Sequence, residues 1–405
     1  MNTLTAPAPM RNDVATIGVV SVAHGMSHFC QLIVPPLFPW IGAAFALSNT
    51  ELGFLLSVYF VLSFCGQAVA GFVVDRFGAE RVLYGGLALI GLAALGLAAS
   101  PSYGVMLVFM ALAGLGNCVF HPVDFSILNA RVSAPRLGHA YAAHGISGNL
   151  GWALAPVFVV GITTATGSWR TALASVSALV ALVLLLAWLQ RSSLAVQRPR
   201  KVAAEADTGF AFLKLPAVWA CFVFFTVYAF ALGGVQSFAP VAAGKLHGVP
   251  LAQVAICLSI YMVAAGAGMV LGGHLVRDPQ RSVRIAAGGF GVAALVALAL
   301  GLGHWTPMIV LMLFALMGFG AGIAGPSRDL LVKQATPPGA TGRVYGVVYS
   351  GLDVGMMLAP LAFGAMMDAG QFRGIWLAIA LVLGLLILTA VNVRRNARPA
   401  LVPAA

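Results

Sequence analysis

Long runs of apolar residues without any charged side chain recur along the whole chain. One of them, Thr171–Leu189, contains no Asp, Glu, Lys or Arg. A helix of that length spans roughly 30 Å, which is the thickness of the hydrocarbon core of a bilayer. Strands of a membrane barrel would alternate apolar and polar residues, and these runs do not. The sequence therefore predicts an all-α integral membrane protein.

Polar breaks between the apolar runs predict about twelve transmembrane helices. Hydrophobic residues make up 60% of the chain and charged residues only 8%, so we expect no large soluble domain and no cofactor held by one. The predicted spans lie near residues 14–45, 51–74, 82–100, 104–130, 137–162, 169–190, 217–241, 252–276, 283–303, 306–333, 341–367 and 371–393.

An internal repeat indicates that these helices form two related halves. The stretch Gly114–Pro156 aligns with Gly318–Pro360 without a gap. Duplicated halves in a membrane protein are often related by a pseudo-twofold axis and enclose a substrate path between them. We therefore expect two pseudo-twofold-related six-helix bundles, residues 1–190 and 216–405, joined by a cytoplasmic linker at 191–215. The shared positions are Gly114/Gly318, Gly116/Gly320, Pro122/Pro326, Gly138/Gly342, Tyr141/Tyr345, Gly151/Gly355 and the Leu-Ala-Pro endings Leu154–Pro156 and Leu358–Pro360.

The distribution of basic residues predicts the orientation in the membrane. Arg170, Lys245 and Arg373 fall in loops on one side, and the other basic loops, the linker and both termini fall on the opposite side. By the positive-inside rule, both termini are then cytoplasmic in a multi-pass protein of a bacterial inner membrane. The net charge of +11 is explained by this topology and by attraction to the lipid bilayer, so it predicts no nucleic-acid partner.

Polar side chains concentrate in a few of the spans. Because a charge at the bilayer centre costs at least about 2.5–3.5 kcal/mol, such residues should face protein or a water-filled path. His121, Asp124 and Asp353 are the candidates for proton coupling, since each can take up or release a proton. Asn117, His121 and Asp124 are spaced to share one helix face, as are His24, His28 and Gln31. The candidates for lining the substrate path are His24, His28, Gln31, Asn117, His144, Asn149, Arg328 and Tyr349.

At two equivalent positions of the repeat, the two copies carry side chains of different charge. Asp124 aligns with Arg328, and Asn149 aligns with Asp353. If the halves are related by an axis along the membrane normal, Asp124 and Arg328 lie at equal depth. One hypothesis is that they pair across the path and release each other when a proton or substrate binds. The alternative is that each residue anchors separately in packed helix contacts.

The loop after the second span carries a recognisable motif, GFVVDRFGAER, from Gly71 to Arg81. It resembles the signature loop of the major facilitator superfamily, although Ala79 and Glu80 depart from the basic consensus. The resemblance implies the major facilitator fold and gating roles for the loop. Gly71 would allow close helix approach, Asp75 would contact a helix N-terminus or Arg, and Gly78 would form the tight turn. Arg76 and Arg81 would complete the gate and set the topology.

A narrower resemblance covers the fourth and fifth spans, GLGNCVFHP from Gly114 and HGISGNLGWALAP from His144, and the HGMSHFCQLIVPPLFP stretch from His24. These segments are similar to the fosmidomycin-resistance branch of drug exporters. That likeness implies proton-coupled export of a small polar or amphipathic compound. The glycines Gly145, Gly148 and Gly151 would give the fifth span a smooth face for near backbone contact.

The sequence therefore predicts a secondary active transporter that works by alternating access, functions as a monomer and exchanges protons for a small molecule. Uptake of a small organic anion is the alternative, because Arg328 would suit an anionic substrate. Metal transport through His24 and His28 is disfavoured because they have no Cys or Glu partner, so no metal site is predicted. ATP-driven transport is disfavoured because no phosphate-binding loop occurs. A membrane enzyme is disfavoured because neither an HExxH motif nor a nucleophile with an evident partner occurs.

Overall fold

The computed structural model describes residues 10–196, 213–275, 282–335 and 341–397. Within these residues, 12 helical segments are long and apolar enough to cross a membrane, as the sequence predicts. The chain separates into two compact units, one of residues 1–33 and 62–202 and the other of residues 34–61 and 203–405. Residues 34–61 thus group with the C-terminal half, although they belong to the N-terminal half of the predicted division.

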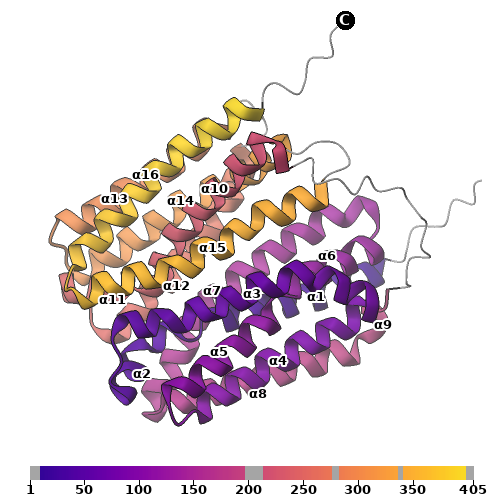
Figure 1. Ribbon diagram of the computed structural model, residues 1–405, viewed down its shortest axis with the longest axis horizontal. Coiled ribbons are helices and arrows are strands. Elements are labelled where there is room, and N and C mark those ends of the chain that lie inside the picture. The colour runs from indigo at the N-terminus through magenta and orange to yellow at the C-terminus, as the bar shows by residue number, and fades with distance from the viewer. Residues whose placement is uncertain (1–9, 197–212, 276–281, 336–340, 398–405) are drawn as a thin grey trace, which may run out of the picture. The chain divides into compact units, whose positions relative to one another are not determined.

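The first unit is built around one helix pair, α1 packed along α7, and one group of three helices, α4 packed against α5 and α8 (Figure 1). The helix α3, Asn49–Phe77, begins in the second unit and ends in the first. The other helices of the first unit are α1 (Met10–Gln31), α4 (Ala79–Ala99), α5 (Tyr103–Asn117), α6 (Phe120–Arg131), η2 (Ala134–Arg136), α7 (Leu137–Thr166), α8 (Trp169–Leu189) and the short α9 (Arg191–Leu194).

In the second unit, α10 packs along α15, α12 packs along α14, and α13 lies against α14 and α16. Its helices are η1 (Pro35–Leu37), α2 (Phe38–Phe45), α10 (Pro216–Ser237), α11 (Ala239–His247), α12 (Leu251–Leu275), α13 (Ser282–Leu302), α14 (Pro307–Ala335), α15 (Thr341–Asp368) and α16 (Phe372–Ala397).

Three predicted spans are interrupted in the structure, and proline accompanies each interruption. The first span breaks before Pro35, the fourth between Asn117 and Phe120, and the seventh at Phe238. Proline has no N–H to donate and its ring crowds the preceding turn. Pro122 therefore explains the break between α5 and α6, and this break separates Asn117 from the helix that carries His121 and Asp124.

The repeated glycines serve the same packing in both units. A Cβ at Gly151 on α7 would lie 2.1 Å from the backbone oxygen of Gly25 on α1. A Cβ at its repeat partner Gly355 on α15 would lie 2.3 Å from the backbone oxygen of Thr226 on α10. The duplicated frame thus brings two helix backbones together in each unit, as the small-residue pattern predicts.

Replacing Gly151 with alanine should destabilise the protein, because the new methyl group has only backbone to move against. Overpacking of this kind costs about 1–3 kcal/mol. Gly161→Ala on the same helix is the matched control, since nothing lies within 4 Å of a Cβ there. Thermal unfolding in detergent should show a lower Tm for Gly151→Ala alone. Equal Tm values for the two variants would contradict the close contact.

Polar contacts hold the start of α1 against neighbouring segments of the first unit. The buried carboxylate of Asp13 accepts hydrogen bonds from the Ser133 hydroxyl at 2.5 Å and from Arg136 Nη1 at 2.7 Å. Thr16 Oγ1 donates to the Ser193 backbone oxygen at 2.8 Å. These bonds tie the start of α1 to the α6–α7 connection and to α9, so the beginning of the predicted linker, at α9, packs on the bundle.

Candidate proton and substrate site

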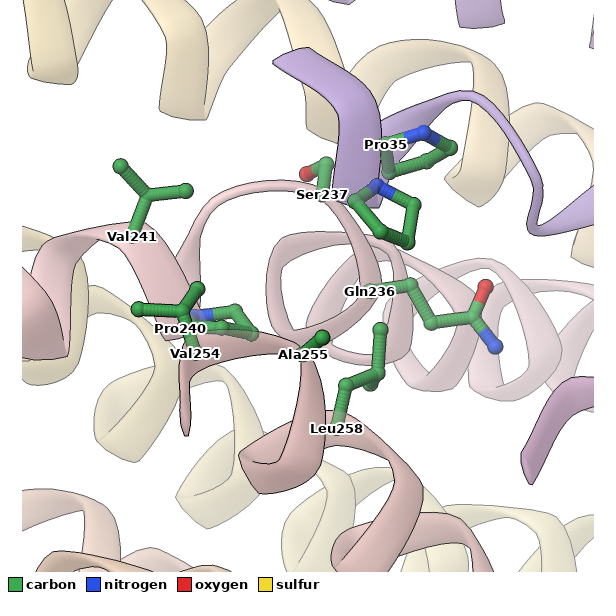
Figure 2. Close-up of a pocket in the computed structure, with 9 residues that line it drawn as sticks. Pro35, Gln236, Ser237, Pro240, Val241, Val254, Ala255 and Leu258 are labelled. Atoms are coloured by element: carbon green, nitrogen blue, oxygen red, sulfur yellow. The ribbon is translucent and has the colours of Figure 1, made fainter. Parts of the chain in front are cut away.

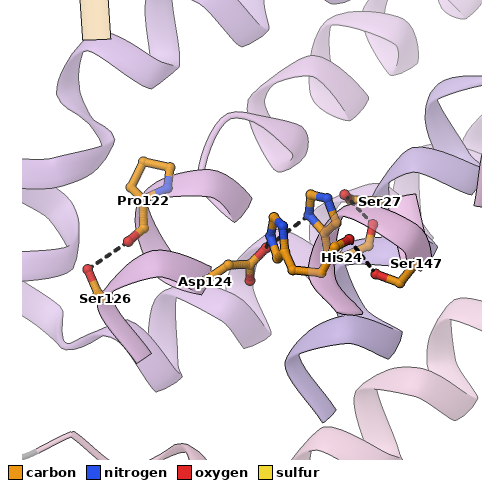
Figure 3. Close-up of polar contacts among 7 residues, drawn as sticks. His24, Ser27, Pro122, Asp124, Ser126 and Ser147 are labelled. Atoms are coloured by element: carbon orange, nitrogen blue, oxygen red, sulfur yellow. Dashed lines mark hydrogen bonds and ion pairs between the residues drawn. The ribbon is translucent and has the colours of Figure 1, made fainter. Parts of the chain in front are cut away.

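A buried carboxylate in the first unit is held by two imidazoles from different helices. Asp124 lies on α6, His24 on α1 and His144 on α7. His24 Nδ1 lies 3.0 Å from Asp124 Oδ2, and His144 Nε2 lies 3.1 Å from the same oxygen. Figure 3 shows His24 directed toward Asp124. An ionised carboxylate only accepts hydrogen bonds, so in that form of Asp124 both rings donate to one oxygen.

The cluster is closed to solvent on one side and open on the other. Asp124 is fully buried, and His24 and His144 are nearly so at 2% and 5% exposure. His121, three residues before Asp124 on α6, is exposed, and its ring centroid lies 5.3 Å from that of His24. The second oxygen of Asp124, Oδ1, has no hydrogen-bond partner among the described residues. A buried polar atom left unpaired in this way marks a site that can accept a proton or an ion.

A row of rings continues from this cluster along the α1–α7 contact. The rings of His24 and His144 stack at 3.5 Å, and those of His28 and Trp152 lie 4.3 Å apart. Trp152 Nε1 donates to Gln31 Oε1 at 2.7 Å. The spacing of His24, His28 and Gln31 correctly placed them on one face. The part played by Trp152 was not predicted, although it lies within the motif that begins at His144.

Glycine makes the room for these rings. A Cβ at Gly148 on α7 would lie 3.0 Å from both His24 Nε2 and His28 Nδ1. Such a contact is tighter than ordinary van der Waals packing, so a side chain here would push the rings from their positions. At Gly148 the close contact is with these rings, and the expected approach to another helix backbone is present at Gly151. It is absent at Gly145, where nothing among the described residues lies within 4 Å of a Cβ.

Two other candidates of the first unit have different contacts. Asn117 Nδ2 donates to Ser63 Oγ on α3 at 3.0 Å. Asn149 Nδ2 donates to the Gly145 backbone oxygen of its own helix at 3.1 Å. The expected single face of Asn117, His121 and Asp124 is thus interrupted by the helix break between Asn117 and Phe120, and neither amide contacts Asp124.

Candidates in the second unit do not form a comparable cluster among the described residues. Asp353 is half-buried on α15, and no described residue forms an ion pair with it. The Tyr349 ring lies 5.0 Å from that of Phe225. The side chain of Arg328 lies outside the described residues, so its pairing with Asp124 stays a prediction.

Comparison with known proteins decides the family. The model of the Major Facilitator Superfamily matches residues 20–349 and 293–404. The chain belongs to this superfamily. It is 25% identical over 377 residues to the uncharacterized MFS-type transporter YfnC of Bacillus subtilis, covering 91% of this chain and 90% of that protein. It is 26% identical over 346 residues to the fosmidomycin resistance protein of Escherichia coli, covering 84% and 83%. The superfamily consists of transporters, which agrees with the expectation that the chain is not an enzyme.

Solved structures confirm the major facilitator fold. A bacterial homologue of the human lysosomal transporter Spinster, in an inward-facing and occupied conformation, matches with a TM-score of 0.72 at 16% identity. The match covers 97% of each chain. At this identity the likeness establishes the fold and leaves the substrate open.

The superfamily's signature loop connects α3 and α4. Gly78 has φ of +90°, a conformation that L side chains rarely adopt, and its N–H donates to the Val74 backbone oxygen at 2.8 Å. The turn predicted at Gly78 is therefore confirmed. The close helix approach predicted at Gly71 is not found, since nothing among the described residues lies within 4 Å of a Cβ there. Asp75, Arg76 and Arg81 are exposed.

The second unit contains a small cavity where α10, α11 and α12 meet η1 (Figure 2). Its polar lining includes Gln236, which is 3% exposed and has no hydrogen-bond partner for either amide atom among the described residues. Pro35, Pro240 and Leu258 form part of the apolar wall. The sequence reasoning missed Gln236, because one amide in an apolar helix has no distinguishing pattern.

Proposed function

We propose that the protein exports a small polar or amphipathic compound in exchange for protons. The observation that carries this proposal is the buried Asp124 carboxylate shared by His24 and His144. No Lys or Arg of the described residues is paired with it. A carboxylate with two neutral imidazoles leaves one uncompensated negative charge inside the protein.

Protonation of this cluster would remove that charge. A charge near the bilayer centre costs at least about 2.5–3.5 kcal/mol, so the charged and neutral forms favour different surroundings. A conformation that gives Asp124 access to water favours the charged form, and an occluded one favours the neutral form. Proton binding can thereby bias the equilibrium between the two states of a transporter. The exposed His121 would relay the proton between the path and the buried carboxylate.

The direction of transport is inferred from similarity. The fosmidomycin resistance protein matches most of this chain, and its name describes tolerance of a toxic compound. Export of a toxic compound out of a bacterial cell gives such tolerance. Antiport with protons that enter from outside would drive this export across the inner membrane, with both termini in the cytoplasm and one chain as the working unit.

Purified protein in proteoliposomes tests the proposal, with fosmidomycin as the first probe. An imposed pH gradient should drive the probe toward the side from which the protons come. Movement in the same direction as the protons would support organic-anion uptake instead. A panel of toxic compounds in overexpressing cells would extend the test. The proposal would be overturned if none of the compounds moved in response to the pH gradient and overexpression raised the tolerance of cells to none of them.

A further inference from the structure

Three imidazoles from three helices of the first unit converge on one point. His24 on α1, His121 on α6 and His144 on α7 can each offer one ring nitrogen, and these nitrogens lie within 4.8 Å of one another. Each residue lies in a separate segment of sequence, and only the fold brings them together. The sequence offered just His24 and His28 on a single helix, which is why no metal site was predicted.

The spacing of these atoms is close to that of a metal site. Ligands of a tetrahedral zinc ion with bonds near 2.1 Å lie about 3.4 Å apart. His24 Nδ1 and His144 Nε2 already lie 3.0 and 3.1 Å from Asp124 Oδ2. Because the three nitrogens lie within 4.8 Å of one another, a shift of at most roughly 1.4 Å brings them to tetrahedral spacing, and His121 is the residue placed to make it. This residue is exposed, so rotation of its side chain can close that gap.

Asp124 supplies the charge that such a site needs. Its Oδ2 lies 3.0 and 3.1 Å from one nitrogen of each of two rings, so these three atoms can ligate one ion when the ion replaces the protons that they share. Its Oδ1 is buried and has no hydrogen-bond partner among the described residues, so it can bind an ion directly or orient the rings around one. This unpaired oxygen is an independent indication that the cluster binds a cation.

We propose that His24, His121, His144 and Asp124 bind one divalent transition-metal ion, such as Zn²⁺, Co²⁺ or Ni²⁺. Imidazole nitrogen suits these ions, whereas Mg²⁺ and Ca²⁺ prefer sites made of oxygen atoms. His121 is the ligand nearest to solvent and gives the ion its entry. Metal binding displaces the protons of these side chains, so the affinity should fall as the pH falls, and it can be measured without any transport of substrate.

Titration of the purified full-length chain with Co²⁺ tests this site, after removal of any polyhistidine tag. The visible absorption of Co²⁺ reports its coordination, and Zn²⁺ should displace it with a stoichiometry of one per chain. Mg²⁺ should not compete. His121→Ala should weaken Co²⁺ binding by at least about 10-fold, as loss of one ligand implies. This exposed side chain can be removed with little risk to folding, which size-exclusion chromatography will check.

His139→Ala is the matched control, because His139 is an exposed histidine on α7 outside the cluster. It should bind Co²⁺ as tightly as the wild type. Equal affinity of His121→Ala and wild type, or no saturable binding at all, would overturn the proposed site. Such a result would leave proton-driven export untouched, since binding is measured here without transport. Conversely, metal binding without gradient-driven flux would contradict the export proposal alone.

Discussion

Replacing Asp124 with asparagine should abolish substrate movement driven by a pH gradient. Asparagine keeps the size of the side chain and one oxygen that can accept a hydrogen bond from His24 or His144. It cannot exchange a proton, so the cluster stays neutral in every conformation. We expect gradient-driven flux to fall by at least about 100-fold, which is the scale of losing a group that carries out proton transfer. Flux into proteoliposomes with an imposed gradient measures this.

Exchange of labelled for unlabelled substrate without a gradient is the internal control for Asp124→Asn. That exchange should persist, because substrate binding and the conformational change need no net proton movement once the carboxylate is neutralised. Asp353→Asn is the comparison variant, since Asp353 was the other acidic candidate and no described residue forms an ion pair with it. Loss of gradient-driven flux in Asp353→Asn, with normal flux in Asp124→Asn, would move the coupling site to α15.

The sequence predicts His24, His144 and Asp124 as site residues, but it does not predict that they contact one another. Apolar runs locate the helices because the bilayer imposes one length and one composition. Helical spacing then places His24, His28 and Gln31 on one face. The convergence of His144 and Asp124 on His24 depends on which helices are neighbours, and a single sequence does not contain that information. The spacing of residues along one helix shows which of them share a face, but the packing of the helices determines which residues of other helices that face contacts.

The break in the fourth span shows a different kind of limit. A regular helix through Asn117, His121 and Asp124 would align all three, and the spacing predicted that. Pro122 stands within this stretch and interrupts the hydrogen-bond ladder, so Asn117 contacts Ser63 instead. The proline itself is the signal in the sequence, because helical periodicity does not hold across a break in the helix.

The grouping of residues 34–61 with the second unit has an identifiable cause. The start of α3 lies along the end of α15, where a Cβ at Gly53 would meet the Pro360 backbone oxygen at 2.3 Å. Ser57 Oγ donates to the Met357 backbone oxygen at 2.7 Å. Through this contact, residues 34–61 of the predicted N-terminal half pack on the predicted C-terminal half and belong to the same compact unit. By the predicted topology it lies near the face opposite the termini.

Asp368 fastens that contact at its end, and its replacement by alanine should release the first turn of α3. The carboxylate accepts from the Asn49 and Thr50 backbone N–H groups at 2.7 and 2.9 Å. It also accepts from their side chains at 2.8 and 2.6 Å. These N–H groups belong to a helix N-terminus, where the helix dipole further favours a carboxylate.

The loss should be visible in hydrogen exchange. A hydrogen bond to a charged group contributes about 1.5–3 kcal/mol, and four are removed together in Asp368→Ala. Amides in the first turn of α3 should then exchange at least about 10-fold faster, because 1.4 kcal/mol corresponds to tenfold in an opening equilibrium. Gln371→Ala, an exposed position just beyond α15, is the matched control and should exchange like the wild type. If Asp368→Ala also leaves that turn protected, the apolar and backbone contacts at Gly53 hold α3 to α15 without the carboxylate.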